Sequence, residues 1–369
     1  MSSKTFFSLP RFLSALLVLL IFFGLFTLGA CNKTPDEPSS SQPAQTTTEI
    51  STAVPTTQAP QLPLNPLTGM PGIRPELVGK RPIAVVVENS PQARPQWGFC
   101  SPDIVIEGVV EGGITRMLWL YSDVEDIPKV GPMRSARHDF VEMAEGLDAI
   151  FAHWGWSDIA ERAIKDRKVN NINGLEGKYF YRDKSRKTAI EHTGYSDGQS
   201  LARAIKDKNY DRPIKDQYTK PFSFASLDSL NTPKGGNSGG VHIEFSSYYK
   251  HDFKFKKSDG LYYNYMNGNP MLEDGGKQMS VTNVIIIYCS TKVVDATGHV
   301  DMDLSSGEGV FLSNGAYENI TWKKGNDPND MLKLYDSQGG ELKLNPGKSY
   351  IGFVPKDQAP KTSVIEAGE

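Results

Sequence analysis

Arg81-Pro82-Ile83-Ala84-Val85-Val86-Val87-Glu88-Asn89 is an apolar, largely β-branched run that starts after a proline and ends at an acid. A short continuous run of this kind predicts a strand buried on both faces of a sheet. Ligands of α/β proteins bind at the carboxyl ends of the strands. Glu88 is therefore a candidate catalytic residue.

Two further strands are predicted next along the chain. Asp103-Ile104-Val105-Ile106-Glu107-Gly108-Val109-Val110 is followed by the turn Glu111-Gly112-Gly113 and by Ile114-Thr115-Arg116-Met117-Leu118-Trp119-Leu120. Two apolar runs around a glycine-rich turn are typical of a hairpin. Arg116 then lies near the start of the returning strand.

The densest polar segment is Gly131-Pro132-Met133-Arg134-Ser135-Ala136-Arg137-His138-Asp139, which precedes an amphipathic stretch from Phe140. We expect Ser135 to cap that helix, so that Arg134 and Arg137 flank its amino end. Helix amino ends attract anions, and guanidinium groups suit phosphate or carboxylate. The alternative is that the arginines brace the fold by pairing with Asp139, Glu88 or Glu107.

A second basic segment runs from Tyr179 to Lys187 and contains Arg182 and Arg186. Together with the following Glu191-His192-Thr193, it predicts a loop over a pocket, and a solvated basic turn is the alternative. His192 and His153 are candidate proton carriers, although single histidines are more often structural. The tryptophans at 154 and 156 could stack on a ligand, but such pairs usually close a core.

Composition changes near Lys220, from alternating helical and strand patterns to short alternating runs separated by Gly and Asn. We therefore expect an α/β N-terminal domain with a mixed sheet and flanking helices, followed by a mostly antiparallel all-β C-terminal domain. Strands are expected at 241–245, 262–265 and 284–288. The segment 231–240, rich in Gly, Asn and Pro, predicts a hinge.

The amino terminus has the order of a bacterial lipoprotein signal. Lys4 and Arg11 precede an apolar run, and Leu28-Gly29-Ala30-Cys31 has small residues directly before the cysteine. The run is short for a membrane span, so cleavage before a lipidated Cys31 is the prediction, and an uncleaved anchor is the alternative. Residues 32–63 are rich in Thr, Ser, Pro and Gln and predict a disordered linker. The expected location is the extracytoplasmic face of the cell membrane.

The predicted organisation is a signal peptide at 1–30, a lipidated cysteine and linker at 31–63, the α/β domain at 64–220, a hinge at 221–240, the β domain at 241–356 and a tail at 357–369.

A formal charge of -3 argues against nucleic acid as a partner. The chain has no CxxC or HExxH motif and its six histidines are scattered, so no metal site is predicted. Cys100 and Cys289 are the two cysteines besides Cys31, and export would permit a disulfide between them. The sequence leaves open whether they pair.

Several motifs together resemble the YerB-like lipoprotein family of Gram-positive bacteria, whose two-part domain has no established activity. They are Asn65-Pro66-Leu67-Thr68-Gly69, Arg81-Pro82-Ile83-Ala84, Ala93-Arg94-Pro95-Gln96, Glu111-Gly112-Gly113-Ile114-Thr115-Arg116, Gly131-Pro132-Met133-Arg134-Ser135-Ala136-Arg137, Phe180-Tyr181-Arg182-Asp183-Lys184-Ser185-Arg186, Thr321-Trp322-Lys323-Lys324 and Leu344-Asn345-Pro346-Gly347. The resemblance covers residues 64 to 356. It departs at Ala189-Ile190-Glu191-His192-Thr193, where the family has a Pro-His-Asn stretch.

The order of elements in the first part is also similar to that of the LytR-CpsA-Psr enzymes, which attach glycopolymers to peptidoglycan by cleaving a polyprenyl pyrophosphate. This similarity implies that Glu88 and Asp103 occupy the positions of Mg²⁺-binding acids. It implies that Arg134, Arg137, Arg182 and Arg186 grip phosphate. The Arg-Asp-Thr triplet of those enzymes is absent here, and Glu88 replaces an aspartate.

Our first hypothesis is an envelope lipoprotein that binds an anionic, phosphate-bearing cell-wall precursor or polymer, either as a glycopolymer transferase or as a binder without turnover. The predicted ligand-binding residues are Arg116, Arg134, Arg137, Arg182, Arg186 and His192, with Glu88 and Asp103 as catalytic candidates and Mg²⁺ as the optional cofactor. The second hypothesis is an interaction module that regulates a wall synthase or hydrolase through an aromatic face at 245–265. A solute-binding receptor is a third, which the β-rich second half fits poorly.

Overall fold

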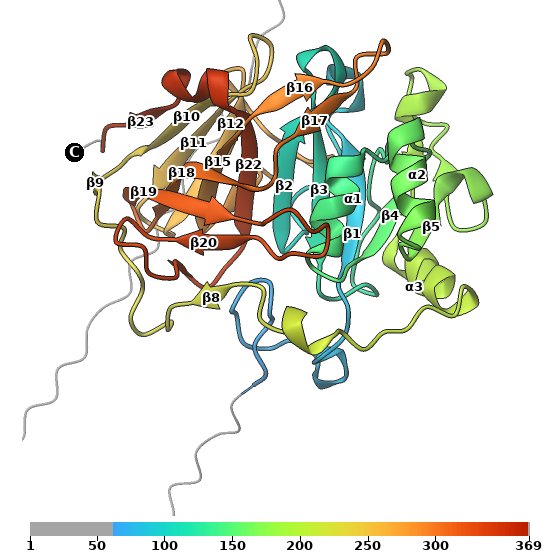
Figure 1. Cartoon of the computed structure of the whole chain (residues 1–369), viewed down its shortest axis with the longest axis horizontal. Coiled ribbons are helices and arrows are strands. Elements are labelled where there is room, and N and C mark those ends of the chain that lie inside the picture. The colour runs from blue at the N-terminus through green and yellow to red at the C-terminus, as the bar shows by residue number, and fades with distance from the viewer. Residues whose placement is uncertain (1–61, 368–369) are drawn as a thin grey trace, which may run out of the picture. The chain divides into compact units, whose positions relative to one another are not determined.

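Strand β1 (Ile83–Glu88) lies inside a large mixed sheet, and all six of its residues are buried. It pairs antiparallel with β3 (Thr115–Tyr121) and parallel with β4 (Ile150–His153). The computed structural model describes residues 62–367 (Figure 1). The predicted signal peptide, Cys31 and nearly all of the predicted linker lie outside these residues. No helix within 62–367 is long and apolar enough to cross a membrane.

The large sheet contains strands from both halves of the described chain. In spatial order they are β20 (Lys333–Tyr335), β19 (Ala316–Lys323), β18 (Ser306–Ser313), β15 (Asn283–Cys289), β22 (Ser349–Pro355), β2 (Ile104–Val109), β3, β1, β4 and β5 (Asn171–Asn173), and β9 (Gly236–Asn237) pairs with β19.

Strand β22 joins the two halves of this sheet. It pairs parallel with β15 on one side and parallel with β2 on the other. The sheet thus runs without interruption from the first predicted domain into the second, as Figure 1 shows. No local pattern in the sequence predicts this join, because β22 and β2 are far apart along the chain.

A second, antiparallel sheet and several two-stranded ribbons complete the β structure. The second sheet contains β13 (Asn269–Pro270), β12 (Leu261–Met266), β11 (Lys250–Lys256), β10 (Gly240–Glu244) and β23 (Ser363–Ile365), with β14 (Ser280–Val281) paired to β12. The ribbons are β16 (Thr291–Val293) with β17 (Val300–Met302), β21 (Lys343–Leu344) with β8 (Ser223–Phe224), and β6 (Tyr181–Arg182) with β7 (Gly194–Tyr195).

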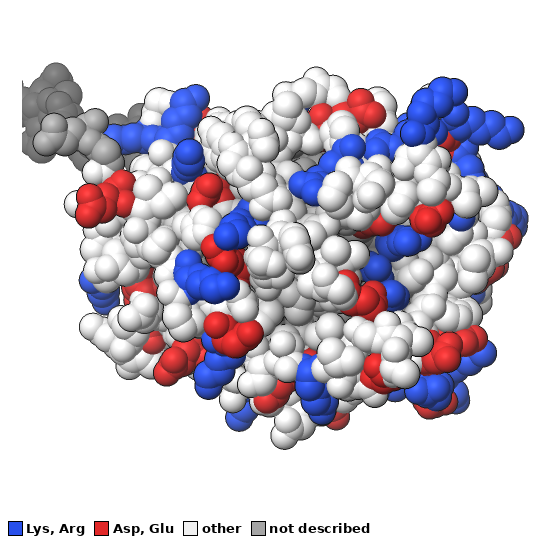
Figure 2. Space-filling model, turned by 90° about the horizontal axis from the view of Figure 1, so that it is seen from above, with Lys and Arg blue, Asp and Glu red and all other residues white. Residues whose placement is uncertain are grey.

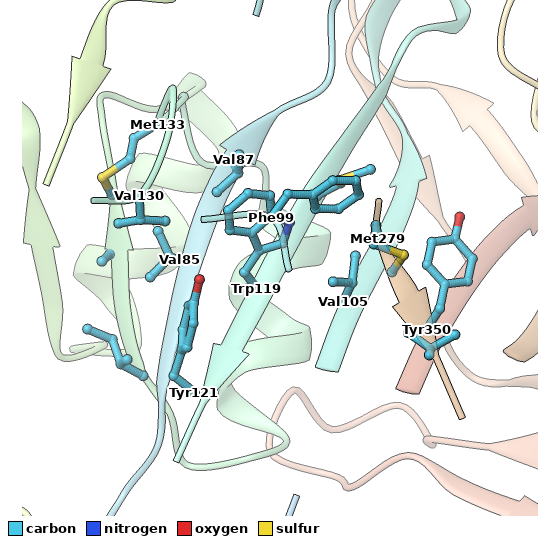
Figure 3. Close-up of a cluster of buried hydrophobic side chains, with 14 of the residues drawn as sticks. Val85, Val87, Phe99, Val105, Trp119, Tyr121, Val130, Met133, Met279 and Tyr350 are labelled. Atoms are coloured by element: carbon cyan, nitrogen blue, oxygen red, sulfur yellow. The ribbon is translucent and has the colours of Figure 1, made fainter. Parts of the chain in front are cut away.

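Both faces of β1 are covered, which explains its continuous apolar run. Ala84 and Val86 face a core that includes α1 (His138–Glu145) and α2 (Asp158–Asp166). Val85 and Val87 face the opposite core, which includes α3 (Gly198–Asp207) and the inner face of the second sheet. Figure 3 shows this second core around the indole of Trp119.

The predicted strands are confirmed, and the fold as a whole is mostly β. The hairpin of β2 and β3, the strand β1 and the three expected later strands, now β10, β12 and β15, are all present. Residues 62–367 contain three α-helices, all between 138 and 207. The large sheet is mixed, as expected for the first part, and β22 adds parallel pairing to a second part expected to be mostly antiparallel.

The predicted hinge and tail are both tied into the β structure. Within 221–240, the backbone N–H groups of Ala225, Gly235 and Ser238 donate to Leu344, Tyr317 and Gly315. Within the predicted tail, β23 pairs antiparallel with β10. Both segments therefore brace the second half of the chain.

A buried ion pair connects the two sheets. Glu107 on β2 and His251 on β11 are both fully buried, with Oε1 and Nε2 3.2 Å apart. Glu107 also accepts hydrogen bonds from Asn89 at 3.0 Å, from Tyr350 of β22 at 2.8 Å and from Thr115. Its partners thus come from both sheets and include no arginine of the described chain. Of the three acids named as alternative arginine partners, Glu88 is the one that pairs with an arginine, Arg134.

The two pKa values of this pair move apart. Burial raises the pKa of Glu107, but the charge of His251 and the hydrogen bonds from His251, Thr115 and Tyr350 outweigh it, so the pKa is lowered. Burial lowers the pKa of His251, but the charge and hydrogen bonds of Glu107 outweigh it, so the pKa is raised. Both groups are therefore held in their charged forms.

Replacing His251 with leucine should destabilise the fold by about 3 kcal/mol or more, because Glu107 would stay buried without its partner. The matched control is His242→Leu on the adjacent strand, where the imidazole is 29% exposed and pairs with Asp252. A surface pair of that kind contributes less than about 1 kcal/mol. Urea unfolding of both variants measures the difference, and equal losses would contradict a structural role for the buried pair.

The stabilisation from this pair should depend on pH in both directions. The contribution of Glu107 is present above its unfolded pKa, near 4.3, and is lost as pH falls through its lowered folded value. The contribution of His251 is complete below its unfolded pKa, near 6.5, and is lost as pH rises through its raised folded value. The gap in unfolding free energy between wild type and His251→Leu should therefore be widest between about pH 4.3 and 6.5. A gap that stays constant from pH 4 to 10 would contradict this.

Candidate functional site

Glu88 lies at the carboxyl end of β1 and is 4% exposed. Its carboxylate accepts a hydrogen bond from Ser90 Oγ at 2.8 Å and contacts His192 Nδ1 at 2.9 Å. The Nε atom of Arg134 lies 3.6 Å from Glu88 Oε1. The structure thus brings three predicted site residues, Glu88, Arg134 and His192, together.

Arg134 reaches this position from an extended segment. Its backbone N–H donates to Val86 of β1 at 3.1 Å, and Met133 forms a bridge to Val87. Helix α1 begins only at His138, with Arg137 at the N-cap position. The predicted cap by Ser135 is wrong, because the Ser135 hydroxyl donates to the Trp154 carbonyl at 3.3 Å instead.

Arg137 is neutralised by Glu111. Its Nη2 donates to Glu111 Oε2 at 2.9 Å while its Nε contacts Oε1, which is a two-point guanidinium–carboxylate contact. Its Nη1 donates to the carbonyl oxygen of Ala136 at 2.8 Å. The expectation that Arg134 and Arg137 jointly form a helix-end anion site is therefore not met, because each arginine faces a different glutamate.

Arg116 is buried behind these residues. It is 4% exposed, and its Nη1 donates to the Ser135 carbonyl at 2.7 Å. Burial, together with the positive charges of Arg137 and Arg134, lowers the pKa of Arg116 to about 9. Arg116 thus holds the segment that carries Arg134 and Arg137 through the Ser135 carbonyl, and it adds positive charge beneath that segment.

Arg182 is the last residue of β6. Its guanidinium stacks over the Trp154 ring, 3.9 Å from the ring centroid, and its Nη1 donates to the Ile190 carbonyl. Burial and the charge of Arg134 lower the pKa of Arg182. The neighbouring Glu191 is exposed, and a hydrogen bond from its own backbone N–H, followed by the charges of His192, Arg134 and Arg182, lowers its pKa.

We use the name arginine group for Arg116, Arg134, Arg137 and Arg182. Three glutamates accompany it, at positions 88, 111 and 191, so one positive charge is in excess. Figure 2 shows the wider surface, on which basic and acidic side chains are interspersed.

Arg186 and His153 have structural contacts. The guanidinium of Arg186 donates to the carbonyl oxygens of Ala93 at 3.0 Å and Pro95 at 2.9 Å. The ring of His153 is fully buried and contacts Gly155 and Asn171. Arg186 therefore does not add free donors to the arginine group.

Asp103 lies at the opposite end of the sheet from Glu88. Glu88 is level with Arg116 on β3, whereas the backbone N–H of Asp103 donates to Leu120. Glu88 and Asp103 are therefore level with positions several residues apart on β3. At a rise of about 3.3 Å per strand residue, their separation is on the order of 15 Å. Glu88 and Asp103 do not fit a shared Mg²⁺ ion, and the metal site implied by the LytR-CpsA-Psr similarity is not supported.

Asp103 instead lines a separate cleft of about 930 Å³. Its carboxylate accepts hydrogen bonds from the Ser122 backbone and hydroxyl, both at 2.7 Å, and from Asn65 at 3.2 Å. Among the charged residues of the lining, four are acidic, Asp103, Asp123, Glu125 and Asp126, and two are basic, Arg74 and Lys348. An anion is therefore less favoured there than at the arginine group.

Comparison with known proteins identifies the family. Residues 67–211 match the N-terminal domain, and residues 241–351 the C-terminal domain, of the model described as "Protein of unknown function (DUF3048)". The chain belongs to the DUF3048 family. It is 33% identical over 310 residues to the "Putative lipoprotein YerB" of Bacillus subtilis strain 168, covering 81% of this chain and 88% of that one.

The fold also has a solved relative. The crystal structure of the YerB protein from Bacillus subtilis matches with a TM-score of 0.71 and 29% sequence identity, covering 82% of this chain and 99% of that one. The resemblance to YerB-like proteins that the motifs indicated is therefore confirmed.

Sequence reasoning undervalued two residues of this site. Glu111 was assigned only to a turn, yet it neutralises Arg137. Trp154 packs against the core, as the sequence predicts, and also supports Arg182. For Glu111, the available signal is its place in the glycine turn that precedes Arg116. For Trp154, the signal is the mixture of aromatic and basic residues in the segment from Tyr179 to Lys187.

Cys100 and Cys289 are free thiols in the structure. Burial raises the pKa of each thiol to about 12. Because the thiolate is the reactive form, neither should react readily with iodoacetamide at pH 8 in the folded protein, and both should react after unfolding. Peptide mass spectrometry measures this, and recovery of a Cys100–Cys289 disulfide from the exported protein would contradict it.

Proposed function

We propose that this DUF3048 protein is an envelope lipoprotein whose arginine group binds a phosphate-bearing cell-wall precursor or polymer. The part that carries the site, 64–220, is the α/β part of the chain, and the β part braces it through β22. The observation that carries the proposal is that Arg134 is partly exposed, makes its one ion pair among the described residues through Nε, and adds its charge to burial in lowering the pKa of Arg182. Guanidinium groups that act on each other in this way repel, and a bound anion would relieve that repulsion.

Arg134 has donors to offer such an anion. Its one ion pair among the described residues is to Glu88 through Nε, its side chain is 29% exposed, and its Nη groups donate to no described residue. Arg182 uses one Nη for the Ile190 carbonyl. The remaining donors of both groups suit the several oxygens of a phosphate or pyrophosphate.

The proposed role is binding without metal-dependent turnover. Glu88 is occupied by His192, Ser90 and Arg134, and Asp103 lies at the far end of the sheet. Guanidinium groups can hold a pyrophosphate whether or not an acid and a metal complete a reaction.

We place the protein on the membrane through Cys31. The relative's name describes it as a putative lipoprotein, and the Leu28-Gly29-Ala30-Cys31 motif of this chain supports the same anchor. A lipidated residue 31 and the linker that follows would hold the site outside the cytoplasm, near wall precursors.

The alternative of an interaction module depended on an aromatic face at 245–265. The aromatic side chains of Phe245, Tyr249, Phe253 and Tyr262 are buried. On the outer side, Lys254 and Lys256 cover Tyr265 and Tyr263. Tyr248, at 70% exposed, is the one aromatic side chain of 245–265 that is open to solvent. A single exposed tyrosine is not the aromatic face that the alternative requires.

The test is a thermal-shift titration of the full-length lipoprotein in detergent with inorganic pyrophosphate and with farnesyl pyrophosphate. A ligand at a hundredfold excess over its dissociation constant stabilises the native state by about 2.7 kcal/mol, which raises the melting temperature. Arg134→Glu should abolish the shift. The matched control is Arg203→Glu, which makes the same charge change on the exposed face of α3 and should retain it.

The outcomes separate the ligand classes. A shift with both compounds supports a pyrophosphate site, and a larger shift with farnesyl pyrophosphate indicates a lipid-linked precursor. No shift with either compound, or an equal shift in Arg134→Glu, would overturn the proposal.

A further inference from the structure

A second polar cluster lies where α1 meets the β16–β17 ribbon, and it has no role in the proposed anion site. It contains His138 and Asp139 from the first turn of α1 and Asp301 from β17. One ligand atom from each residue lies within 4.8 Å of the other two. Figure 1 shows the ribbon beside the helix.

The separations suit a shared metal ion. His138 Nε2 is 2.8 Å from Asp301 Oδ1 and 3.5 Å from Asp139 Oδ1. Ligands at about 2.1 Å from a zinc ion lie roughly 3.0 to 3.4 Å apart for octahedral or tetrahedral angles. Small adjustments of the side chains would therefore place all three atoms around one ion.

Asp139 is a buried carboxylate without a full counter-charge. It is 3% exposed, and its one hydrogen bond among the described residues comes from the Met302 backbone N–H to Oδ1, at 3.0 Å. Among residues 62–367, His138 supplies the one basic nitrogen within 4 Å of its carboxylate. A buried carboxylate of this kind is costly unless a cation or further donors compensate it.

The surroundings leave one open side. Asp301 is 31% exposed, and its other oxygen pairs with Lys292, whose side chain is 72% exposed. Such a surface pair contributes little, so Lys292 can move away from an incoming cation. The Met302 contact holds the Asp139 carboxylate in place, as an outer hydrogen bond does in metal sites.

We propose that His138, Asp139 and Asp301 form a binding site for a divalent cation of the Zn²⁺ type. One imidazole nitrogen and two carboxylate oxygens favour such an ion over Mg²⁺ or Ca²⁺, which prefer oxygen ligands alone. Three protein ligands leave a fourth position for water. The site goes beyond the proposed anion binding and does not depend on it, although a cation there would add positive charge next to Arg137.

The test is isothermal titration of the full-length protein in detergent with Zn²⁺ alone. We expect one ion per chain in wild type and at least tenfold weaker binding in Asp301→Asn and in His138→Gln. Asp301→Asn retains an oxygen that can accept a hydrogen bond from His138, so it should fold. The matched control is Asp303→Asn on the same strand connection, where the carboxylate accepts from Ser305, and it should bind as wild type does.

Two results would overturn the proposal. One is the absence of saturable Zn²⁺ binding to wild type. The other is binding to Asp301→Asn and His138→Gln that is as tight as in wild type. Loss of that binding in His242→Asn would then place the ion at His242, which lies between Asp252 and Glu244. If the variants do not fold, the anomalous signal of Zn²⁺ in wild-type crystals decides, with a peak about 2.0 to 2.2 Å from His138 Nε2 expected.

Discussion

The buried contact between Glu107 and His251 holds the two sheets of this protein together, and the candidate site depends on it. Glu107 lies on β2, between β22 and β3 in the large sheet, and His251 lies on β11 of the second sheet. Asn89, the residue after Glu88, donates to the same carboxylate. The end of β1 is thus tied to the joint between the sheets. A charged pair without water requires close to complete hydrogen bonding, which the surrounding Thr115 and Tyr350 provide.

The strands held at this contact between the sheets determine where the arginines lie. β3 places Arg116 level with Glu88, and the extended loop along the end of β1 places Arg134 beside it. Glu111, in the turn between β2 and β3, faces Arg137. Each arginine therefore has a different environment: Arg116 is buried, Arg137 is neutralised, and Arg134 with Arg182 remains partly open. That difference, which depends on the fold and not on the number of basic residues, makes one pair the proposed anion site.

Local patterns in the sequence predicted the strands and the residues at the end of β1, because periodicity and turn residues act over short distances. The joins between distant segments could not be predicted in this way. Glu107 and His251 are 144 positions apart, and β22 reaches β2 from the opposite end of the chain. The Ser135 cap failed because the bridges of Met133 to β1 and of Ala136 to Trp156 keep the loop extended past Ser135. β1 and β2 both pair antiparallel with β3, so they run in the same direction. Glu88 is at the carboxyl end of β1 and Asp103 is at the amino end of β2, which places the two acids at opposite ends of the sheet.

The most direct measurement for the central claim is a difference electron-density map from crystals of the protein soaked with pyrophosphate. The account predicts density within hydrogen-bonding distance of the Arg134 and Arg182 guanidinium groups, with the contact of Glu88 to His192 retained. Density in the acidic cleft around Asp103, or at Arg186, with none at Arg134 would contradict it.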